Sequence, residues 1–355
     1  MSQPLRVGVV GLGFAGQTHL KAYQQIPGVE VLALAGQEED RLQKIADEGN
    51  IPHRYANWED LVARDDLDVI SVCTPTFLHA PVAIAALEGG RHVLSEKPLA
   101  KTADEALQMS EAAQKAGRVL ETAFNHRQRG DVQTLKGFID AGELGRIYHS
   151  KARWLRRSGI PGLGSWFTNK QMAGGGPLID LGVHVLDMAL FLLGEPKVTS
   201  VSAATYAELG PRGRGGGPSN KQLVDTVYEV EDLATAFLRL EGGGTLLLEA
   251  AWAAYRETGD DFGVTLMGTE GGADIDVKNY GWQDTLRVYT DVADTASEIR
   301  PEVTKGEGHL TVVRNFVDII RNGDWSEHVG GEGLRRAQII DACYTSALEG
   351  KEVTL

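Results

Sequence analysis

Two short segments of the sequence carry side chains that could move a proton to or from an alcohol. Lys97 follows an apolar run that we interpret as a strand, and a lysine at a strand end can donate to a substrate oxygen. Asp180 and His184 are four residues apart, so a helix would place them on one face, where the histidine can act as acid or base. Each segment also allows a plainer interpretation, a surface lysine in the first case and an ion pair within a helix in the second.

A glycine-rich turn after the first apolar run has the spacing of a phosphate-binding loop. Its first glycine allows a tight turn, its second lets the backbone approach a diphosphate, and its third lets a helix pack against a strand. The turn follows a predicted buried strand and opens a predicted helix, which is the context that such a loop requires. The sequence therefore predicts a dinucleotide cofactor bound by Gly11, Leu12, Gly13, Phe14, Ala15 and Gly16.

The choice between NAD and NADP depends on the end of the second predicted strand. An acidic residue that binds the ribose 2′-hydroxyl is expected there, about 20 residues further on, but the sequence has Gly36 and Gln37. Arg41 is near enough in sequence to pair with a 2′-phosphate, whereas Glu38 could bind the hydroxyl of NAD instead. A solvated helix start, where acidic residues favour the helix dipole, is the structural alternative. Of the two cofactors we favour NADP.

The first part of the chain alternates apolar runs with helical patterns, which predicts an α/β Rossmann domain with a doubly wound parallel sheet. The predicted strands are Leu5–Val10, Val29–Ala35, Leu67–Val72, Arg91–Ser95 and Val119–Ala123. The predicted helices are Phe14–Ile26, Glu38–Glu48, Pro81–Leu87 and Ala103–Ala116. Lys97 then follows the fourth strand, at the carboxyl edge of the sheet where ligands bind in this architecture.

Beyond Asn125 the order of elements changes and predicts an α+β domain on a large, mostly antiparallel sheet. Helices are predicted at Asp131–Ala141, Leu178–Leu193, Leu310–Arg321 and Gly333–Leu348, and strands at Ile147–Leu155 and, with a hairpin of Ala234–Leu240 and Thr245–Ala251, over most of 198–289. We therefore predict a dinucleotide-binding domain at 1–124 and a substrate-binding and oligomerisation domain at 125–355. The glycine-rich segment Glu208–Asn220 lacks a flanking strand and helix, so we interpret it as a surface connection and not as a phosphate loop.

Several segments together resemble the Gfo/Idh/MocA family of oxidoreductases, which includes glucose–fructose oxidoreductase and inositol dehydrogenase. The resemblance covers nearly the whole chain. The Glu-Lys-Pro triplet and the Asp/His spacing are quite specific to the family, whereas the glycine loop is not. The segments that carry it are Val7–Gly13, Cys73–His79, Glu96–Pro98, Gly142–Ile147, Gly174–His184 and Tyr344–Gly350.

The resemblance implies hydride transfer between a nicotinamide and a secondary alcohol or ketone of a sugar, sugar derivative or cyclitol. It implies that Lys97 lies against the nicotinamide and the substrate, that Asp180 binds a substrate hydroxyl, and that His184 is the general acid/base. Glu96 would fix the nicotinamide end, and a cis peptide bond would precede Pro98. Further cofactor contacts are expected from Thr74, Pro75 and His79, and further substrate contacts from Asn125, Arg153 and Trp166. The open sheet of the second domain would mediate a homodimer or homotetramer.

Composition narrows the classes of partner. The net charge of −14 argues against nucleic-acid or anionic-membrane binding, because such binding needs a basic surface. Cys73 and Cys343 lie in apolar runs and are expected to be buried free thiols in a reducing compartment. No signal peptide or spanning segment is visible, so we expect a cytoplasmic protein. We expect no metal site.

Two other functions are compatible with these motifs. One is a glycosidase that retains a tightly bound NAD and works by transient oxidation. The other is a non-catalytic regulator that senses the cofactor, which the combined presence of Lys97, Asp180 and His184 disfavours.

Overall fold

The computed structural model describes residues 3–216 and 228–355, which form two compact units. The first unit contains Met1–Asn125 and Glu307–Ala337, and the second contains His126–Gly306 and Gln338–Leu355. The predicted division into 1–124 and 125–355 differs from this in the segment Glu307–Ala337. That segment groups with the first unit because its helix α9 (His309–Asn322) buries apolar side chains in the same cluster as strand β1 (Leu5–Val10) and helix α1 (Phe14–Tyr23).

The first unit is built on a six-stranded parallel sheet in the order β3-β2-β1-β4-β5-β6. The strands are β1 Leu5–Val10, β2 Val29–Ala35, β3 His53–Tyr55, β4 Val69–Val72, β5 His92–Ser95 and β6 Leu120–Thr122. The strand order reverses between β1 and β4, which is the point where ligands bind in doubly wound sheets. The predicted fold class is confirmed for this unit.

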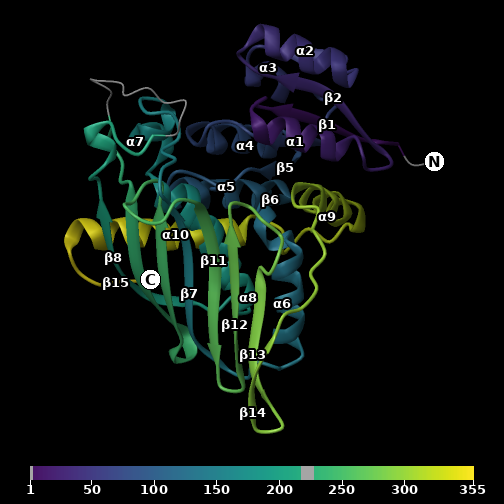
Figure 1. Cartoon of the computed structure of the whole chain (residues 1–355). Coiled ribbons are helices and arrows are strands. Elements are labelled where there is room, and N and C mark those ends of the chain that lie inside the picture. The colour runs from purple at the N-terminus through teal and green to yellow at the C-terminus, as the bar shows by residue number, and fades with distance from the viewer. Residues whose placement is uncertain (1–2, 217–227) are drawn as a thin grey trace. The chain divides into compact units, whose positions relative to one another are not determined.

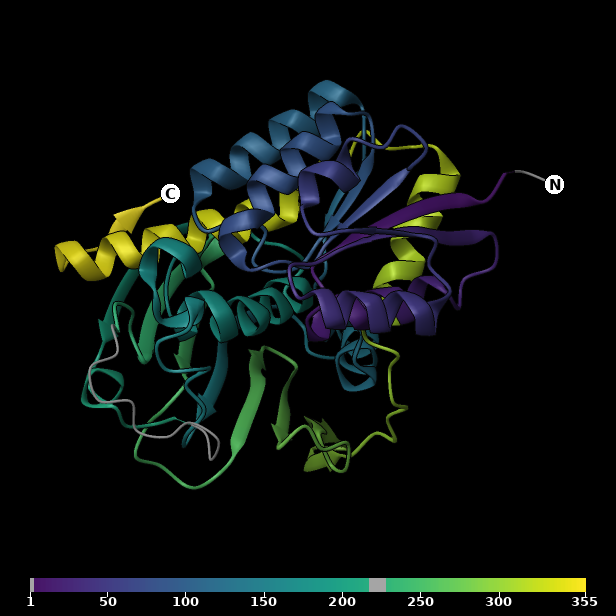
Figure 2. The same cartoon turned by 90° about the horizontal axis from the view of Figure 1, so that it is seen from above.

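Helices cover both faces of this sheet (Figure 2). The helices are α1 Phe14–Tyr23, α2 Glu39–Gly49, α3 Trp58–Val62, α4 His79–Glu88, α5 Ala103–Ala116 and α9. Apolar side chains of α1, α2 and α9 share one core cluster, and those of α3, α4 and α5 share a second. Helix α1 ends at Tyr23, three residues before the predicted end, because the chain turns there toward Gly28, which has a φ of +71°.

The second unit is built on a nine-stranded, mostly antiparallel sheet in the order β14-β13-β12-β11-β7-β10-β9-β8-β15 (Figure 1). The strands are β7 Ile147–Arg156, β8 Val198–Tyr206, β9 Leu233–Leu240, β10 Thr245–Ala251, β11 Asp260–Gly268, β12 Gly271–Lys278, β13 Leu286–Val292, β14 Thr295–Ile299 and β15 Val353–Thr354. The strands β9 and β10 form the predicted hairpin. Central strand β7 pairs parallel with β10 and antiparallel with β11.

Helices α6 (Gly130–Asp140) and α8 (Val183–Leu192) contribute apolar side chains to the core of this second sheet. The C-terminal part of α10 (Gly331–Glu349) joins the same core. By length and composition the helical stretch Lys170–Leu192 could cross a membrane, but 89% of its apolar window is buried inside the structure, as in the core helix of a soluble protein. In the segment Glu208–Asn220, the described residues end at Gly216, which bridges to Ile160, and residues 217–220 lie outside the described part of the chain.

Candidate active site

The glycine loop after β1 has the shape that a bound diphosphate requires. Gly11 has a φ of +93°, and a Cβ there would lie 2.3 Å from the carbonyl oxygen of Cys73. At Gly16 a Cβ would lie 1.8 Å from the carbonyl oxygen of Gly11, so these two positions need glycine for the fold itself. A Cβ at Gly13 would meet no atom within 4 Å. The middle glycine therefore opens onto free space beside the first turn of α1, where a diphosphate fits.

The loops after β1, β4 and β5 all lie at the carboxyl edge of the first sheet because these strands are parallel neighbours. Thr74 and Pro75 follow β4. The Thr74 hydroxyl is buried and has no hydrogen-bond partner among residues 3–216 and 228–355. A buried hydroxyl without a partner is costly unless a ligand supplies one. This edge therefore fits a nicotinamide dinucleotide, held by the glycine loop and by Thr74.

The end of β2 leaves the cofactor preference open. A Cβ at Gly36 would come within 3.0 Å of the side chain of Leu12, which lies in the glycine loop. Arg41 donates to Glu38 at 2.8 Å, and both side chains are largely exposed. The two residues that could favour opposite cofactors are thus paired with each other. An exposed pair of this kind contributes little energy, so a cofactor could recruit either partner.

Lys97 lies directly after β5, and the peptide bond between Lys97 and Pro98 is cis, as predicted. His79, at the start of α4, is buried, and its two ring nitrogens lie 2.9 Å from the carbonyl oxygen of Thr74 and 2.8 Å from that of Pro98. Burial lowers the pKa of His79 despite these two carbonyls. His79 therefore ties the loop after β4 to the Lys97–Pro98 turn, and a direct contact with cofactor stays a prediction.

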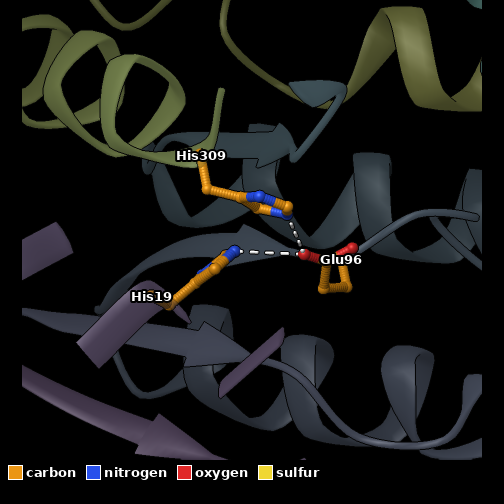
Figure 3. A group of neighbouring side chains, drawn as sticks. All are labelled: His19, Glu96 and His309. Atoms are coloured by element: carbon orange, nitrogen blue, oxygen red, sulfur yellow. Dashed lines mark hydrogen bonds and ion pairs between the residues drawn. The ribbon is translucent and has the colours of Figure 1, made fainter. Parts of the chain in front are cut away.

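Glu96 is buried and is surrounded by histidines that come from distant parts of the first unit (Figure 3). Its Oε1 lies 3.1 Å from Nε2 of His19 on α1 and 3.2 Å from Nε2 of His309 on α9. The sequence analysis assigned Glu96 to the nicotinamide and assigned nothing to His19 or His309. Only its place in the first turns of the helix after the glycine loop could have drawn attention to His19, and no local pattern points to His309.

Asp180 and His184 belong to the second unit and lie in a helix that is not uniform. Residues Leu178–Gly182 form a π-helical turn, and α8 starts at Val183. The prediction of one continuous helix over Leu178–Leu193 is corrected in this respect. The wider turn holds Asp180, whose Oδ2 accepts a hydrogen bond of 2.9 Å from Nε1 of the fully buried Trp252. Such turns occur frequently at functional sites.

The glycines before this turn serve the packing of the second unit. Glycines at the start of a helix could also serve to keep side chains out of the way of a ligand. A Cβ at Gly175 would instead lie 1.9 Å from the hydroxyl of Tyr344, and one at Gly176 would lie 2.1 Å from the carbonyl oxygen of Glu231. The buried Glu231 carboxylate accepts hydrogen bonds from the amides of Gly176 and Leu178 and from Tyr344. These glycines therefore admit the groups that anchor the start of the helix.

The imidazole of His184 is buried among other rings. The ring of His126 lies 4.6 Å away between centroids, and that of Trp154 lies 5.4 Å away. Trp154, on β7, stacks on Phe262 of β11 and donates to Asp260 at 2.6 Å. Trp154 is only 2% exposed and belongs to the hydrophobic core of the second unit, so its indole packs against the His184 ring and supports it. The sequence analysis assigned no role to Trp154 or to His126.

Arg153 does not share the side of the sheet that carries Trp154. Successive residues of a strand point to opposite faces, and Arg153 pairs with Asp276 of β12 at 2.7 Å. A contact of Arg153 with substrate stays a prediction. Arg156 lies on the Trp154 face, donates to Asp260 at 2.8 Å and to the Tyr280 hydroxyl at 3.1 Å. Burial lowers the pKa of Arg156, but the charges of Asp260, Tyr280 and Asp180 outweigh this and raise it.

The two other predicted substrate residues lie in short turns. Trp166 begins the turn Trp166–Thr168 and stacks on Phe167 with ring centroids 3.8 Å apart. Phe167 in turn lies edge-on to Trp252, which binds Asp180. Asn125 begins the turn Asn125–Gln128 that follows β6 and carries His126. Both residues are partly buried, and their contacts with substrate stay predictions.

Comparison with known proteins agrees with this geometry. The Gfo/Idh/MocA model described as "Oxidoreductase family, NAD-binding Rossmann fold" matches residues 5–124, and the C-terminal domain model of that family matches residues 132–274. The chain is 33% identical over 362 residues to D-glucoside 3-dehydrogenase of Escherichia coli, covering 100% of this chain and 98% of that protein. It is 32% identical to levoglucosan dehydrogenase of Pseudarthrobacter phenanthrenivorans, covering 96% and 88%.

A solved structure is similar over the whole length. Levoglucosan dehydrogenase in complex with NADH and levoglucosan superposes with a TM-score of 0.84 at 27% identity, covering 99% of both chains. The resemblance read from the sequence is thereby confirmed. With both domain models matched and full-length relatives above 30% identity, the chain belongs to the Gfo/Idh/MocA family of oxidoreductases.

Proposed function

We propose that this oxidoreductase is an NAD(P)-dependent dehydrogenase that oxidises a secondary alcohol of a sugar, sugar derivative or cyclitol. The observation that carries the proposal is the shared edge of the first sheet. There the glycine loop, the buried Thr74 hydroxyl and Lys97 follow neighbouring parallel strands. The similarity to D-glucoside 3-dehydrogenase and levoglucosan dehydrogenase supports a sugar as substrate.

Each of the three candidate residues has one task in the proposed reaction. Lys97 donates a hydrogen bond to the reacting oxygen, His184 takes the hydroxyl proton when alcohol becomes ketone, and Asp180 binds a neighbouring hydroxyl. The nicotinamide, when bound, accepts the hydride from the carbon. In reduction His184 returns the proton. Arg156 lies on the Trp154 face of β7 and provides a donor for a polyhydroxylated ring, while the buried Trp154 packs against the His184 ring.

The cofactor is NAD or NADP, and the preference for NADP stays a prediction that rests on Gly36 and Gln37. The similar levoglucosan dehydrogenase binds NADH. We further propose a homo-oligomer formed through the nine-stranded sheet, a cytoplasmic location and no nucleic-acid or membrane partner. A gel-filtration and light-scattering measurement tests the first of these.

A panel of methyl glucosides, levoglucosan and inositols, each with NAD⁺ and NADP⁺, tests the proposed activity. We expect at least one sugar to produce reduced cofactor at the nicotinamide absorbance, and Lys97→Met to abolish this signal while binding reduced cofactor within a few-fold of wild type. A glycosidase with bound NAD would instead release aglycone with no net absorbance change. A regulator would bind cofactor and turn over nothing on the panel.

A further inference from the structure

His19, Glu96 and the partly buried His309 form a polar cluster within the first unit (Figure 3). Neither histidine takes part in the proposed reaction. His19 lies on α1, Glu96 at the end of β5 and His309 on α9. In sequence, His19 is 77 residues and His309 is 213 residues away from Glu96. The imidazole centroids of His19 and His309 lie 5.6 Å apart. Both rings thus converge on one carboxylate oxygen.

Every group in the cluster can be satisfied by hydrogen bonds. Nδ1 of His19 lies 2.7 Å from the hydroxyl of Ser71, which can donate to it, and this leaves the Nε2–H of His19 to donate to Glu96. The Nε2–H of His309 donates to the same Oε1. Burial raises the pKa of Glu96, but the hydrogen bonds from His19 and His309 outweigh this and hold it well below its usual range. Each of the two imidazoles can therefore donate one hydrogen bond to the Glu96 carboxylate.

The second oxygen of Glu96 connects the cluster to Lys97. The backbone amide of Lys97 donates to Oε2 of Glu96 at 3.2 Å, and the amide of Glu96 donates to the carbonyl oxygen of Val72 on β4 at 2.9 Å. Oε1 of Glu96 thus contacts the two imidazoles, while Oε2 accepts a hydrogen bond from the backbone amide of Lys97, the candidate catalytic lysine. The position of the Lys97 backbone depends on groups from α1 and α9.

We propose that His19 and His309 are positioning residues that hold Glu96 so that it fixes the backbone of Lys97. The inference rests on the proposed function, because it gives the cluster a purpose only if Lys97 acts on the substrate. Misplacing a reacting group by about 1 Å can cost on the order of a hundredfold in rate. Helices α1 and α9 would then together fix the backbone turn that follows β5.

Two substitutions at His309 test the proposal. His309→Phe keeps a ring but removes the donor, whereas His309→Gln keeps an amide donor that can reach Glu96. We expect His309→Phe to lower kcat by about tenfold or more while the Kd for reduced cofactor changes by no more than about twofold, and His309→Gln to recover most of the rate. Hydrogen–deuterium exchange of the peptide covering residues 94–99 should accelerate in His309→Phe and return toward wild type in His309→Gln.

His328→Phe is the matched control. His328 pairs with Glu121 of β6 at 2.6 Å, so it also ties the returning C-terminal segment to the first sheet, but it is not linked to Lys97. This variant should leave kcat and the exchange of residues 94–99 unchanged.

Three results would decide against the cluster as a positioning device. A His309→Phe enzyme with normal kcat and normal exchange would show that the cluster serves stability alone. A proportional loss of cofactor affinity would show that it serves binding. One equivalent of a divalent metal in the purified wild-type protein, lost in His309→Phe, would show a metal site. If the wild-type protein oxidises no sugar, the proposed function fails, and the exchange measurement still decides whether the cluster holds Lys97.

Discussion

Asp180 and His184 have different surroundings, although four residues separate them. Asp180 lies in the π-helical turn and accepts a hydrogen bond from Trp252, which suits a carboxylate that must keep one orientation to hold a hydroxyl. His184 lies one step into α8 with its ring against His126 and Trp154. An ion pair on a helix surface, the plainer interpretation of the sequence, would have neither the buried indole donor nor the aromatic surroundings. The sequence could supply the spacing but not these partners. They come from β7, from the loop that follows β10 and from the turn Asn125–Gln128.

We expect His184→Gln to lower kcat for alcohol oxidation by roughly a hundredfold to ten-thousandfold, because a positioned proton acceptor is lost while most of the side-chain volume remains. In the wild type the rate should rise with pH as a histidine base loses its proton, and the variant should lose this rise. Initial rates across a pH series test both points. If the pH–rate profiles of the two proteins overlay, another group is the base.

Replacing Trp252 with phenylalanine removes one hydrogen bond and keeps most of the ring. We expect Trp252→Phe to raise KM for the sugar by roughly tenfold with little change in kcat, because a hydrogen bond that orients the Asp180 carboxylate is lost. Trp325→Phe is the control, since its indole also donates, but to the carbonyl oxygen of Ile320 in the first unit. A fall in kcat with unchanged KM in Trp252→Phe would show that Asp180 does more than bind.

At the scale of elements, the bounds of long regular helices and strands can be predicted from local sequence, whereas very short strands and irregular turns cannot. The elements α5, β1, β2 and β10 were predicted at their observed bounds, and β9 was predicted one residue short, because their patterns are regular. The strand β3 was not predicted, since three residues are too few to show a period. The π-helical turn was not predicted either, because Glu231 and Tyr344, which anchor it, are distant in sequence.

The end of β2 should control the choice of cofactor. Gly36→Asp places a carboxylate where a 2′-phosphate would lie, so we expect the ratio of NADP to NAD efficiency to fall by roughly tenfold or more. The added Cβ also presses on Leu12, and Gly36→Ala isolates that steric effect. Kinetics with both cofactors for both variants provide the measurement. An equal fall in the alanine variant would mean that shape and not charge is responsible.

The strand β5 begins with a histidine that should make stability depend on pH. Burial, with a smaller contribution from Arg118, lowers the pKa of His92 from 6.5 to about 4, and its Nδ1 accepts a hydrogen bond from the amide of Val119. The folded state therefore binds fewer protons than the unfolded chain between these values, and stability is lost as pH falls through that window. We expect His92→Asn, which keeps an acceptor but cannot titrate, to flatten the fall in Tm from pH 7 to pH 4.5. A parallel slope in both proteins would contradict this.

At the scale of the whole molecule, the sequence predicted the order of a Rossmann unit followed by an α+β unit, because the change from alternating to consecutive strands is visible along the chain. It did not predict that Glu307–Ala337 returns to the first unit. The amphipathic pattern of α9 predicts a helix with a buried face, but no local feature says which core that face joins. The cluster of His19, Glu96 and His309 was not predicted for the same reason, since His309 is the first residue of α9.

The central claim is that a carbon of the sugar gives a hydride to the nicotinamide. Turnover of a glucoside that carries deuterium on every ring carbon, followed by mass spectrometry of the cofactor, tests this most directly. The proposed reaction moves one deuterium from the oxidised carbon to each molecule of reduced cofactor formed, with a keto sugar as the other product. Consumption of the glucoside with unlabelled or unreduced cofactor would contradict the account.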